Sequence, residues 1–273
     1  MAFLDVGGLR LRVEREGPRG ESALVALHGF TGTAEELLAP ARRLSDIERI
    51  GVDLIGHGQS DAPADPARYG FEQAIQDLVK LLERLERPSV ELWGYSQGGR
   101  LALAFALAHP KRVTRLILES ASPGIESESE RTVRRHDDET LAQFIEREGI
   151  EAFVARWEAL PLFASERELP PEARAELRRS RLSQRAVGLA NALRGLGTGT
   201  QPSFWPRLHE LGCPTLLITG ARDEKFHAIA QGMSQQLPNS RHISIADAGH
   251  APHRERPAAC VAAVAEFLFA RKP

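Results

Sequence analysis

The chain has 273 residues, a formal net charge of −2 at pH 7, 42% hydrophobic residues and 26% charged residues. A chain of this length can bury a large core and form one α/β domain with room for an insertion. Its near-zero charge gives no attraction to nucleic acid or anionic lipid, and no apolar run is long enough to span a bilayer, so we expect no nucleic-acid partner and no membrane.

The beginning of the chain and its cysteines indicate a compartment. Residues 1–17 alternate apolar and acidic side chains and lack the basic stretch, apolar run and cleavage site of an export signal. Cys213 and Cys260 are the only cysteines, which is more typical of buried thiols in a reducing compartment than of a disulfide framework. We therefore expect a cytoplasmic protein.

In chain order, the first predicted elements are short strands that alternate with helices. Runs rich in leucine and β-branched residues predict strands buried on both faces. The periodicity between them predicts helices, most clearly over 71–85 and 100–108. The predicted strands cover residues 23–27, 49–52, 90–93 and 113–118. Such alternation favours a parallel sheet.

Residues 124–199 break this pattern with charged helical stretches and no convincing strand. The strand pattern then resumes at 214–219 and 241–245. We predict a core domain of residues 1–123 and 200–273, with a helical insertion of residues 124–199 that we call the cap. The mixed charges of the cap are expected to lie mostly on solvated helix faces.

The segment Gly94-Tyr-Ser96-Gln-Gly98 lies between a predicted strand and a predicted helix. This order is typical of a nucleophile elbow, in which a serine occupies a sharp and strained turn. The flanking residues must then lack bulk, which the two glycines satisfy. The dipole of the following helix would favour negative charge at Ser96 Oγ.

A serine of this kind needs a base and a carboxylate, which arrive later in the chain in the order Ser, Asp, His. Asp223 follows the predicted strand 214–219, and His250 follows the strand 241–245. We predict that His250 takes the proton of Ser96 while Asp223 fixes the imidazole tautomer and stabilises the imidazolium.

Two nearby residues are alternatives for these roles. His253 ranks second to His250, because Gly249 directly precedes His250 and permits a turn that directs its ring back to the sheet edge. Asp247 is too close in sequence to His250 to come from the preceding strand end, so a turn-forming role is more probable for it.

The segment His28-Gly-Phe30 follows the strand 23–27, where this type of fold supplies an oxyanion-hole N–H group. We predict that the backbone N–H groups of Phe30 and Gln97 form the oxyanion hole. His28 and the Gly-rich turn 53–60, which lacks a phosphate-loop lysine, are interpreted as structural. The remaining histidines have no metal-ligand spacing, so we expect neither a metal nor a cofactor. The fold class is therefore α/β, with the α/β-hydrolase architecture of a mostly parallel sheet flanked by helices.

Arg100 lies one helical turn after Ser96 and is the only charge at the start of an apolar helix. A cation in the first turn opposes the helix dipole, and burial without a partner would be costly. We expect an anion to contact it. This anion is either an internal Asp or Glu or a carboxylate of the substrate.

Over essentially its whole length the chain resembles the 2-succinyl-6-hydroxy-2,4-cyclohexadiene-1-carboxylate synthases of menaquinone biosynthesis. The narrowest shared motifs are Gly98-Gly-Arg100, Trp157-x-x-x-Pro161-x-Phe163 and Asp223-x-Lys225-Phe226. The resemblance implies a lyase that eliminates pyruvate from a small tricarboxylate, with the triad acting in proton abstraction. The expected assembly is a monomer or small homo-oligomer.

The resemblance also implies that three arginines bind the substrate carboxylates, and by motif position these are Arg100, Arg134 and Arg181. Tyr95 and Trp157 are further candidates for substrate contact. Three arginines match three carboxylates, whereas a neutral ester would leave them unpaired. The alternative function is that of a carboxylesterase or carbon–carbon bond hydrolase, and a non-enzymatic ligand sensor is weakest because the triad is complete. Close competitors for the position of Arg181 are Arg131, Arg135, Arg178, Arg179 and Arg185.

Overall fold

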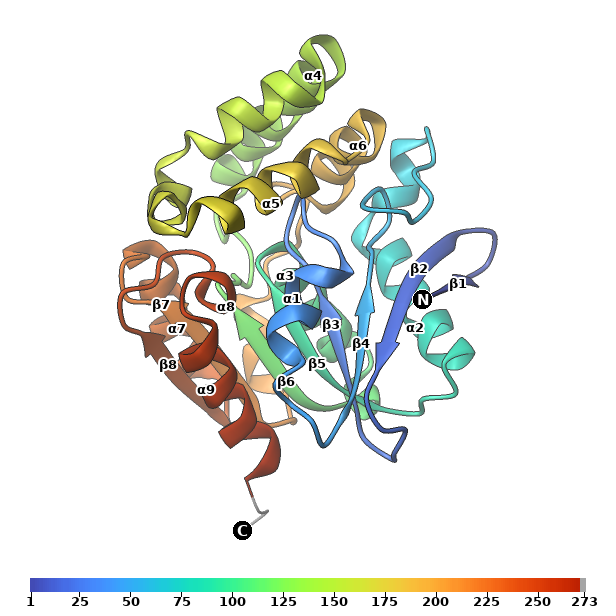
Figure 1. The fold of residues 1–273 in the computed structure, drawn as a ribbon, viewed down its shortest axis with the longest axis vertical. Coiled ribbons are helices and arrows are strands. Elements are labelled where there is room, and N and C mark those ends of the chain that lie inside the picture. The colour runs from blue at the N-terminus through green and yellow to red at the C-terminus, as the bar shows by residue number, and fades with distance from the viewer. Residues whose placement is uncertain (271–273) are drawn as a thin grey trace.

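A computed structural model describes residues 1–270 and contains an eight-stranded sheet with helices on both faces (Figure 1). The strand order is β1-β2-β4-β3-β5-β6-β7-β8. Strands β1, β2 and β4 pair antiparallel, and the pairs from β4 onward are parallel. The strands are β1 (Ala2–Asp5), β2 (Arg10–Glu16), β3 (Ala23–Leu27), β4 (Glu48–Val52), β5 (Val90–Tyr95), β6 (Val113–Glu119), β7 (Thr215–Gly220) and β8 (Ser240–Ile245).

The six strands expected from the sequence all form, with ends that differ by one or two residues. Helices follow most of them, as the α/β-hydrolase fold predicts. The helices are α1 (Ala34–Ala41), α2 (Phe71–Arg84), α3 (Gln97–Ala108), α4 (Glu128–Glu158), α5 (Pro171–Leu182), α6 (Ala186–Leu196), α7 (Glu224–Gln236), α8 (Pro252–Glu255) and α9 (Pro257–Phe269). Short 3₁₀ segments are Pro66–Tyr69, Pro110–Arg112, Pro161–Glu168 and Trp205–Glu210.

The sheet is buried on both faces, which explains why its central strands are almost wholly apolar. Helices α2, α3 and α7 contribute side chains to the larger core on one face. Helices α1 and α9 contribute to the core on the other face. Because β5, β6, β7 and β8 run parallel, their carboxyl ends lie at one edge of the sheet, where Ser96, Asp223 and His250 follow β5, β7 and β8.

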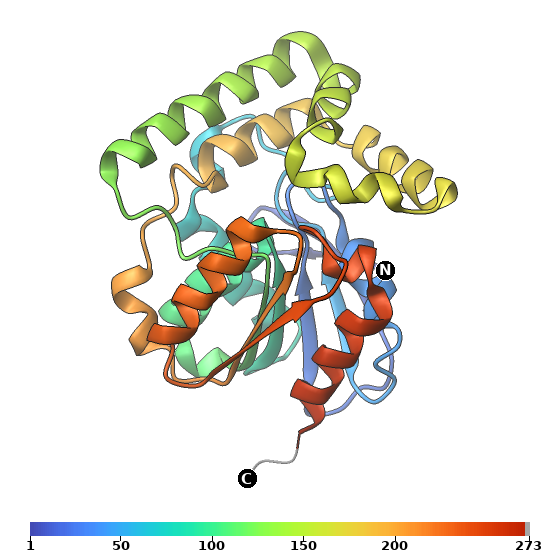
Figure 2. The same ribbon diagram turned by 90° about the vertical axis from the view of Figure 1, so that its left-hand side faces the viewer.

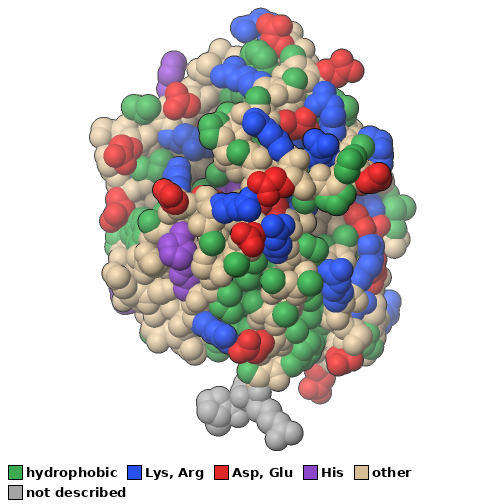
Figure 3. Space-filling view, turned by 60° about the vertical axis from the view of Figure 1, so that its left-hand side comes forward, with side chains coloured by type: hydrophobic (Ala, Val, Ile, Leu, Met, Phe, Trp, Pro, Cys, Tyr) green, Lys and Arg blue, Asp and Glu red, His purple; other side chains and the backbone are tan. Residues whose placement is uncertain are grey.

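Within the described residues 124–199 every regular element is helical, and these helices lie over the strand ends (Figures 1 and 2). The long helix α4 bends at Gly149, whose φ of 82° is accessible to glycine. Helices α4 and α6 share a small apolar cluster that includes Ile145, Phe153 and Leu189. On the face shown in Figure 3, positive and negative side chains are interspersed over the upper part of the molecule, where the cap lies.

Strands β1 and β2 were not expected from the sequence. The signal for β2 is a period of two, because Leu9, Leu11 and Val13 are buried while the arginines between them are not. Strand β1 is nearly all exposed, so its side chains carry no burial pattern. It forms through antiparallel backbone pairing with β2.

Candidate active site

Ser96 occupies the sharp turn between β5 and α3 and has φ 49° and ψ −108°, a strained conformation for a residue with a side chain. A Cβ on Gly94 would lie 2.5 Å from the carbonyl oxygen of Gly98, and one on Gly98 would lie 2.1 Å from that of Leu27. Both glycines are therefore required by close backbone contact, as the elbow motif predicts.

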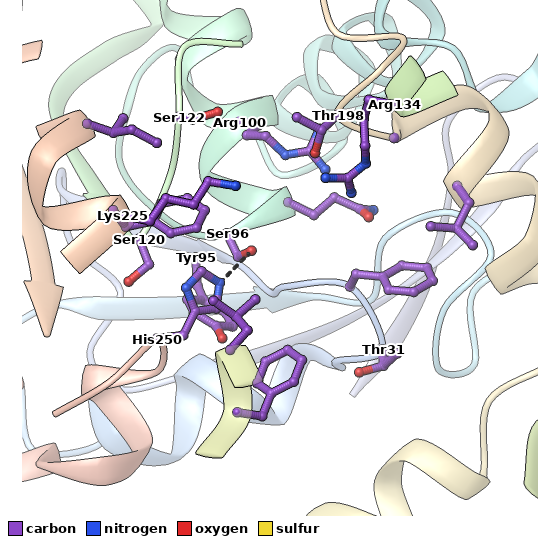
Figure 4. Close-up of a pocket in the computed structure, with 18 of the residues that line it drawn as sticks. Thr31, Tyr95, Ser96, Arg100, Ser120, Ser122, Arg134, Thr198, Lys225 and His250 are labelled. Atoms are coloured by element: carbon purple, nitrogen blue, oxygen red, sulfur yellow. Dashed lines mark hydrogen bonds between the residues drawn. The ribbon is translucent and has the colours of Figure 1, made fainter. Parts of the chain in front are cut away.

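The structure brings Ser96, Asp223 and His250 together, and Figure 4 shows the contact between Ser96 and His250. His250 Nδ1 lies 2.7 Å from Asp223 Oδ2, and His250 Nε2 lies 3.2 Å from Ser96 Oγ. An ionised Asp223 can only accept, so Nδ1 carries the proton and Nε2 is free to accept the hydroxyl proton of Ser96. Both His250 and Asp223 are buried, which strengthens their interaction. The geometry is that of a base oriented by a carboxylate and in contact with a hydroxyl.

The two alternative residues are engaged elsewhere. The backbone N–H of His253 donates to Glu119 Oε1 at 2.8 Å, and its ring atom Nδ1 lies 2.8 Å from the same oxygen. The ring of His253 is buried. Asp247 is exposed, and its carboxylate lies 3.6 Å from the guanidinium of Arg222. Neither residue contacts Ser96 in the way that His250 does.

The two expected oxyanion donors flank Ser96. Among residues 1–270 the backbone N–H groups of Phe30 and Gln97 find no hydrogen-bond acceptor, so both are free to bind a ligand oxygen. His28 is held behind them, since its Nε2 accepts from the N–H of Leu54 at 2.9 Å. This contact agrees with the structural role expected for His28.

Ser96 and His250 line a cavity of ≈ 460 Å³ to which core and cap both contribute (Figure 4). The cavity wall carries an excess of cationic side chains over carboxylates, which favours an anionic ligand. The cations are Arg100, Arg134, Arg181, Lys225 and Arg254, and the carboxylate is Glu36.

Arg100 is 9% exposed, and no carboxylate within residues 1–270 lies within ion-pair distance of it. Its one side-chain partner in that range is the neutral Gln201, whose Oε1 lies 3.3 Å from the guanidinium. Burial, with a smaller contribution from the charge of Arg134 that Asp138 opposes, lowers the pKa of Arg100 to about 10. Asp138 thus acts on Arg100 at longer range, but within residues 1–270 no carboxylate forms an ion pair with the guanidinium.

Arg134 and Arg181 both line the cavity but differ in their pairing. Arg134 Nε donates to Asp138 at 2.8 Å. Arg181 is buried and donates to Glu166 at 2.8 Å and to Glu158 at 3.3 Å. Of the six cap arginines weighed for the third position, Arg181 alone borders this cavity, yet two carboxylates already neutralise it.

Tyr95 and Trp157 also line the cavity. The ring of Tyr95 lies 5.5 Å from that of His250, and burial raises the pKa of its hydroxyl well above the ordinary value. Trp157 packs 5.3 Å from Phe30, and its buried Nε1 has no hydrogen-bond partner among residues 1–270. An unpaired indole donor beside the site is available to a ligand.

Lys225 has a place in the site that the sequence analysis did not assign. It lines the cavity with its ammonium directed inward (Figure 4), and no carboxylate of residues 1–270 forms an ion pair with it. The sequence feature that could have indicated this position is the Asp223-x-Lys225-Phe226 motif, which places Lys225 two residues after the triad carboxylate. Ser120 also lines the cavity, and its buried Oγ has no partner among the described residues.

Two further properties concern residues 1–270. No group of three or more His, Cys, Asp and Glu side chains in this range is arranged to hold a metal ion. None of the helices in this range is both long and apolar enough to cross a membrane.

The elbow, the triad and the sheet define a class of protein, and a comparison with protein families agrees. The chain belongs to the α/β-hydrolase fold family, whose model matches residues 22–257. Within that class it belongs with the 2-succinyl-6-hydroxy-2,4-cyclohexadiene-1-carboxylate synthases, as the sequence motifs suggested.

Three relatives support this placement. A protein of Bacillus subtilis (strain 168), provisionally named as such a synthase, is 45% identical over 96% of this chain and 95% of its own length. The synthase of Enterobacter sp. (strain 638) is 34% identical over 94% of this chain and 95% of its own. The solved structure of MenH from S. aureus is 37% identical with a TM-score of 0.90, covering 94% of this chain and 97% of that one.

Proposed function

We propose that this protein eliminates pyruvate from 2-succinyl-5-enolpyruvyl-6-hydroxy-3-cyclohexene-1-carboxylate to give 2-succinyl-6-hydroxy-2,4-cyclohexadiene-1-carboxylate in menaquinone biosynthesis. The observation that carries this proposal is a serine triad beside a cavity in which Arg100 is buried without an ion-pair partner among residues 1–270. A buried unpaired guanidinium is costly for the free protein, and a substrate carboxylate would remove that cost.

In the proposed reaction Ser96 acts as a base. His250, held by Asp223, accepts the hydroxyl proton and so raises the basicity of Ser96 Oγ. The serine oxygen removes the proton next to the succinyl ketone, and the bond from the ring to the enolpyruvyl oxygen breaks as the new ring double bond forms. The enolate of pyruvate leaves with the electron pair of that bond and takes up a proton at its methylene carbon to give pyruvate, which balances the proton that Ser96 removed.

The oxyanion hole stabilises the charge that moves onto the ketone oxygen during proton removal. Phe30 and Gln97 supply backbone N–H groups that need no reorganisation, because neither is engaged in the free protein. Arg100 and Arg134, which lie near each other on the cavity wall in Figure 4, bind substrate carboxylates. The third carboxylate is bound by Arg181, as the resemblance implies, or by Lys225, whose ammonium is not neutralised.

The enzyme acts in the cytoplasm as a monomer or small homo-oligomer, without cofactor, nucleic acid or membrane. Residues 124–199 act as a lid over the core formed by 1–123 and 200–273.

The test is a comparison of two activities of the wild-type protein. Pyruvate release from the enolpyruvyl substrate is followed with a coupled dehydrogenase, and hydrolysis of small aryl esters is measured on the same preparation. We expect efficient pyruvate release and feeble ester hydrolysis. Efficient ester or carbon–carbon bond cleavage without pyruvate release would assign the protein to the hydrolases of the same fold.

A further inference from the structure

The segment of residues 29–32, here called the oxyanion loop, carries the Phe30 N–H in a conformation that the loop does not stabilise by itself. Thr31 has a φ of 71°, which is unfavourable for a β-branched residue. The one backbone hydrogen bond within the loop joins the N–H of Gly32 to the carbonyl oxygen of Gly29 at 3.0 Å. The position of the Phe30 N–H therefore depends on contacts from outside the loop.

The first such contact comes from the cap. Gln184, between α5 and α6, is 4% exposed and donates through Nε2 to the carbonyl oxygens of Thr31 and Gly32, each at 3.2 Å. Its Oε1 accepts from the N–H of Gly58 at 2.9 Å. One amide thus joins the cap to the oxyanion loop and to the neighbouring turn of the core.

The second contact is an ionic chain. Glu36 of α1 accepts the N–H of Gly29 at 2.8 Å, and its other carboxylate oxygen is bound by Arg254. The second terminal nitrogen of Arg254 binds Glu166 in the cap segment Pro161–Glu168. The side chains of Glu36, Arg254 and Glu166 are 9%, 16% and 7% exposed, so these charge-assisted bonds are little weakened by solvent.

A third contact is apolar. The ring of Phe30 lies 6.0 Å from that of Phe153 and 5.3 Å from that of Trp157, both on α4. The cap therefore contacts the oxyanion loop in three ways. Gln184 binds two of its carbonyl groups, the ionic chain from Glu166 ends at the N–H of Gly29, and two aromatic rings of α4 pack against Phe30.

We propose that Gln184 and Glu166 are positioning residues, which hold the oxyanion loop so that the Phe30 N–H points at the reacting oxygen. The proposal rests on the proposed roles of Ser96 and Phe30. Under this proposal the oxyanion hole is complete only when the cap contacts the oxyanion loop. The cap also forms part of the cavity wall. Neither residue needs to contact the reacting atoms.

The test uses two pairs of isosteric variants. Gln184→Glu removes the amide donor to the oxyanion loop, and its control Asn191→Asp removes a buried cap amide that donates to the core carbonyls of Pro63 and Ala64 at 3.2 and 3.1 Å. Glu166→Gln weakens the ionic chain. Its control Glu168→Gln weakens a cap–core ion pair with Arg222, at 2.7 Å, that does not reach the loop.

The first readout is the rate at which diisopropyl fluorophosphate inactivates Ser96, a reaction that uses the triad and oxyanion hole but not the enolpyruvyl substrate. Loss of one oxyanion donor costs about 10²–10³-fold, so a displaced donor is expected to slow inactivation by about tenfold in Gln184→Glu and Glu166→Gln. The controls are expected to stay within about twofold of the wild type, since they leave the oxyanion loop untouched.

The second readout is pyruvate release by Gln184→Glu, in which kcat should fall more than KM rises, because the oxyanion forms only in the reaction. Glu166→Gln is judged by the first readout, since Glu166 also neutralises Arg181. A merely structural role would lower the melting temperature of test and control variants alike without separating their rates. Equal inactivation rates within both pairs would overturn the proposal while leaving the function intact. A wild type that releases pyruvate but is not inactivated by the fluorophosphate would also overturn the proposal, whereas a wild type that releases no pyruvate would overturn the proposed function. If Gln184→Glu does not fold, the Glu166 pair decides alone.

Discussion

At the scale of single residues, Arg100 is a buried charge that costs stability. Within residues 1–270 its guanidinium lies over the Phe71 ring and has one side-chain hydrogen-bond partner, the neutral amide of Gln201. The lowered pKa of about 10 means that the folded state disfavours the charged form. This cost is present at neutral pH and is relieved only as the pH rises through the lowered pKa.

Arg100→Met is therefore expected to stabilise the free protein while it abolishes efficient turnover. The methionine keeps the aliphatic packing and removes the buried charge, which costs on the order of 1–3 kcal/mol. Thermal unfolding should show a rise in Tm of about 2–4 °C for each kcal/mol. A lower Tm would mean that the guanidinium is satisfied in the free protein and is not held for a substrate.

The triad gives a second prediction at this scale. Ser96→Ala and His250→Ala should each reduce kcat for pyruvate release by at least about 10³-fold, because the two residues act as one unit. For the same reason the double variant should be little worse than either single variant. Near-wild-type turnover of Ser96→Ala, measured by the coupled assay, would rule out serine as the base. His253→Ala is the comparison variant, with a modest effect expected since its partner is Glu119.

At the scale of elements, the cap contributes the wall of the cavity opposite the triad. If α4 and the segment Pro161–Glu168 close over bound substrate, a ligand should slow hydrogen exchange in residues 124–199 more than in the sheet. Exchange followed by mass spectrometry, with and without a tricarboxylate analogue, measures this. Equal protection of cap and sheet would contradict a mobile lid.

The ionic chain between core and cap predicts a pH dependence. Burial raises the pKa of Glu36, but the charge of Arg254, the nearby rings of His253 and His28 and the bond from Gly29 lower it by more, so its net pKa lies below the ordinary value of 4.5. A carboxyl group with a lowered folded pKa contributes stability that is complete above the unfolded value and is lost as the pH falls through the folded value.

Acidification below about pH 4.5 should therefore lower the Tm of the wild type through protonation of Glu36, among other carboxylates. Glu36→Gln should show a smaller fall in Tm over the same interval, although it starts lower at neutral pH. The measurement is thermal unfolding of both proteins across that range. Parallel curves would show that Glu36 does not contribute to the pH dependence.

At the scale of the whole molecule, the sequence predicts what is local and leaves out what depends on tertiary contact. Short motifs at strand ends predict the elbow and the order of Ser96, Asp223 and His250. The structure brings these three side chains together. Strand β1 carries no burial pattern, so sequence periodicity could not reveal it.

The same limit applies to the site. Gln184 lies 153 residues from Thr31 in the chain, and no motif connects the two. Motif position points to Arg181, but it cannot show that Glu158 and Glu166 neutralise this residue. The absence of an acidic partner for Arg100 likewise depends on which residues of other elements fold around it. Sequence motifs thus identify the reacting groups, and the tertiary fold determines which charges remain available to a substrate.

The most direct measurement of the central claim is the ratio of pyruvate release to aryl-ester hydrolysis in Arg100→Ala and Arg134→Ala relative to the wild type. Loss of a charged partner for a desolvated carboxylate costs on the order of 2–5 kcal/mol, or about 30- to 5000-fold in kcat/KM. We predict a loss of this size for pyruvate release in Arg100→Ala, a clear loss in Arg134→Ala, and ester hydrolysis within a few-fold of the wild type in both. Equal losses in the two activities, or no loss of pyruvate release, would contradict the claim that these arginines direct the triad to a carboxylate-bearing substrate.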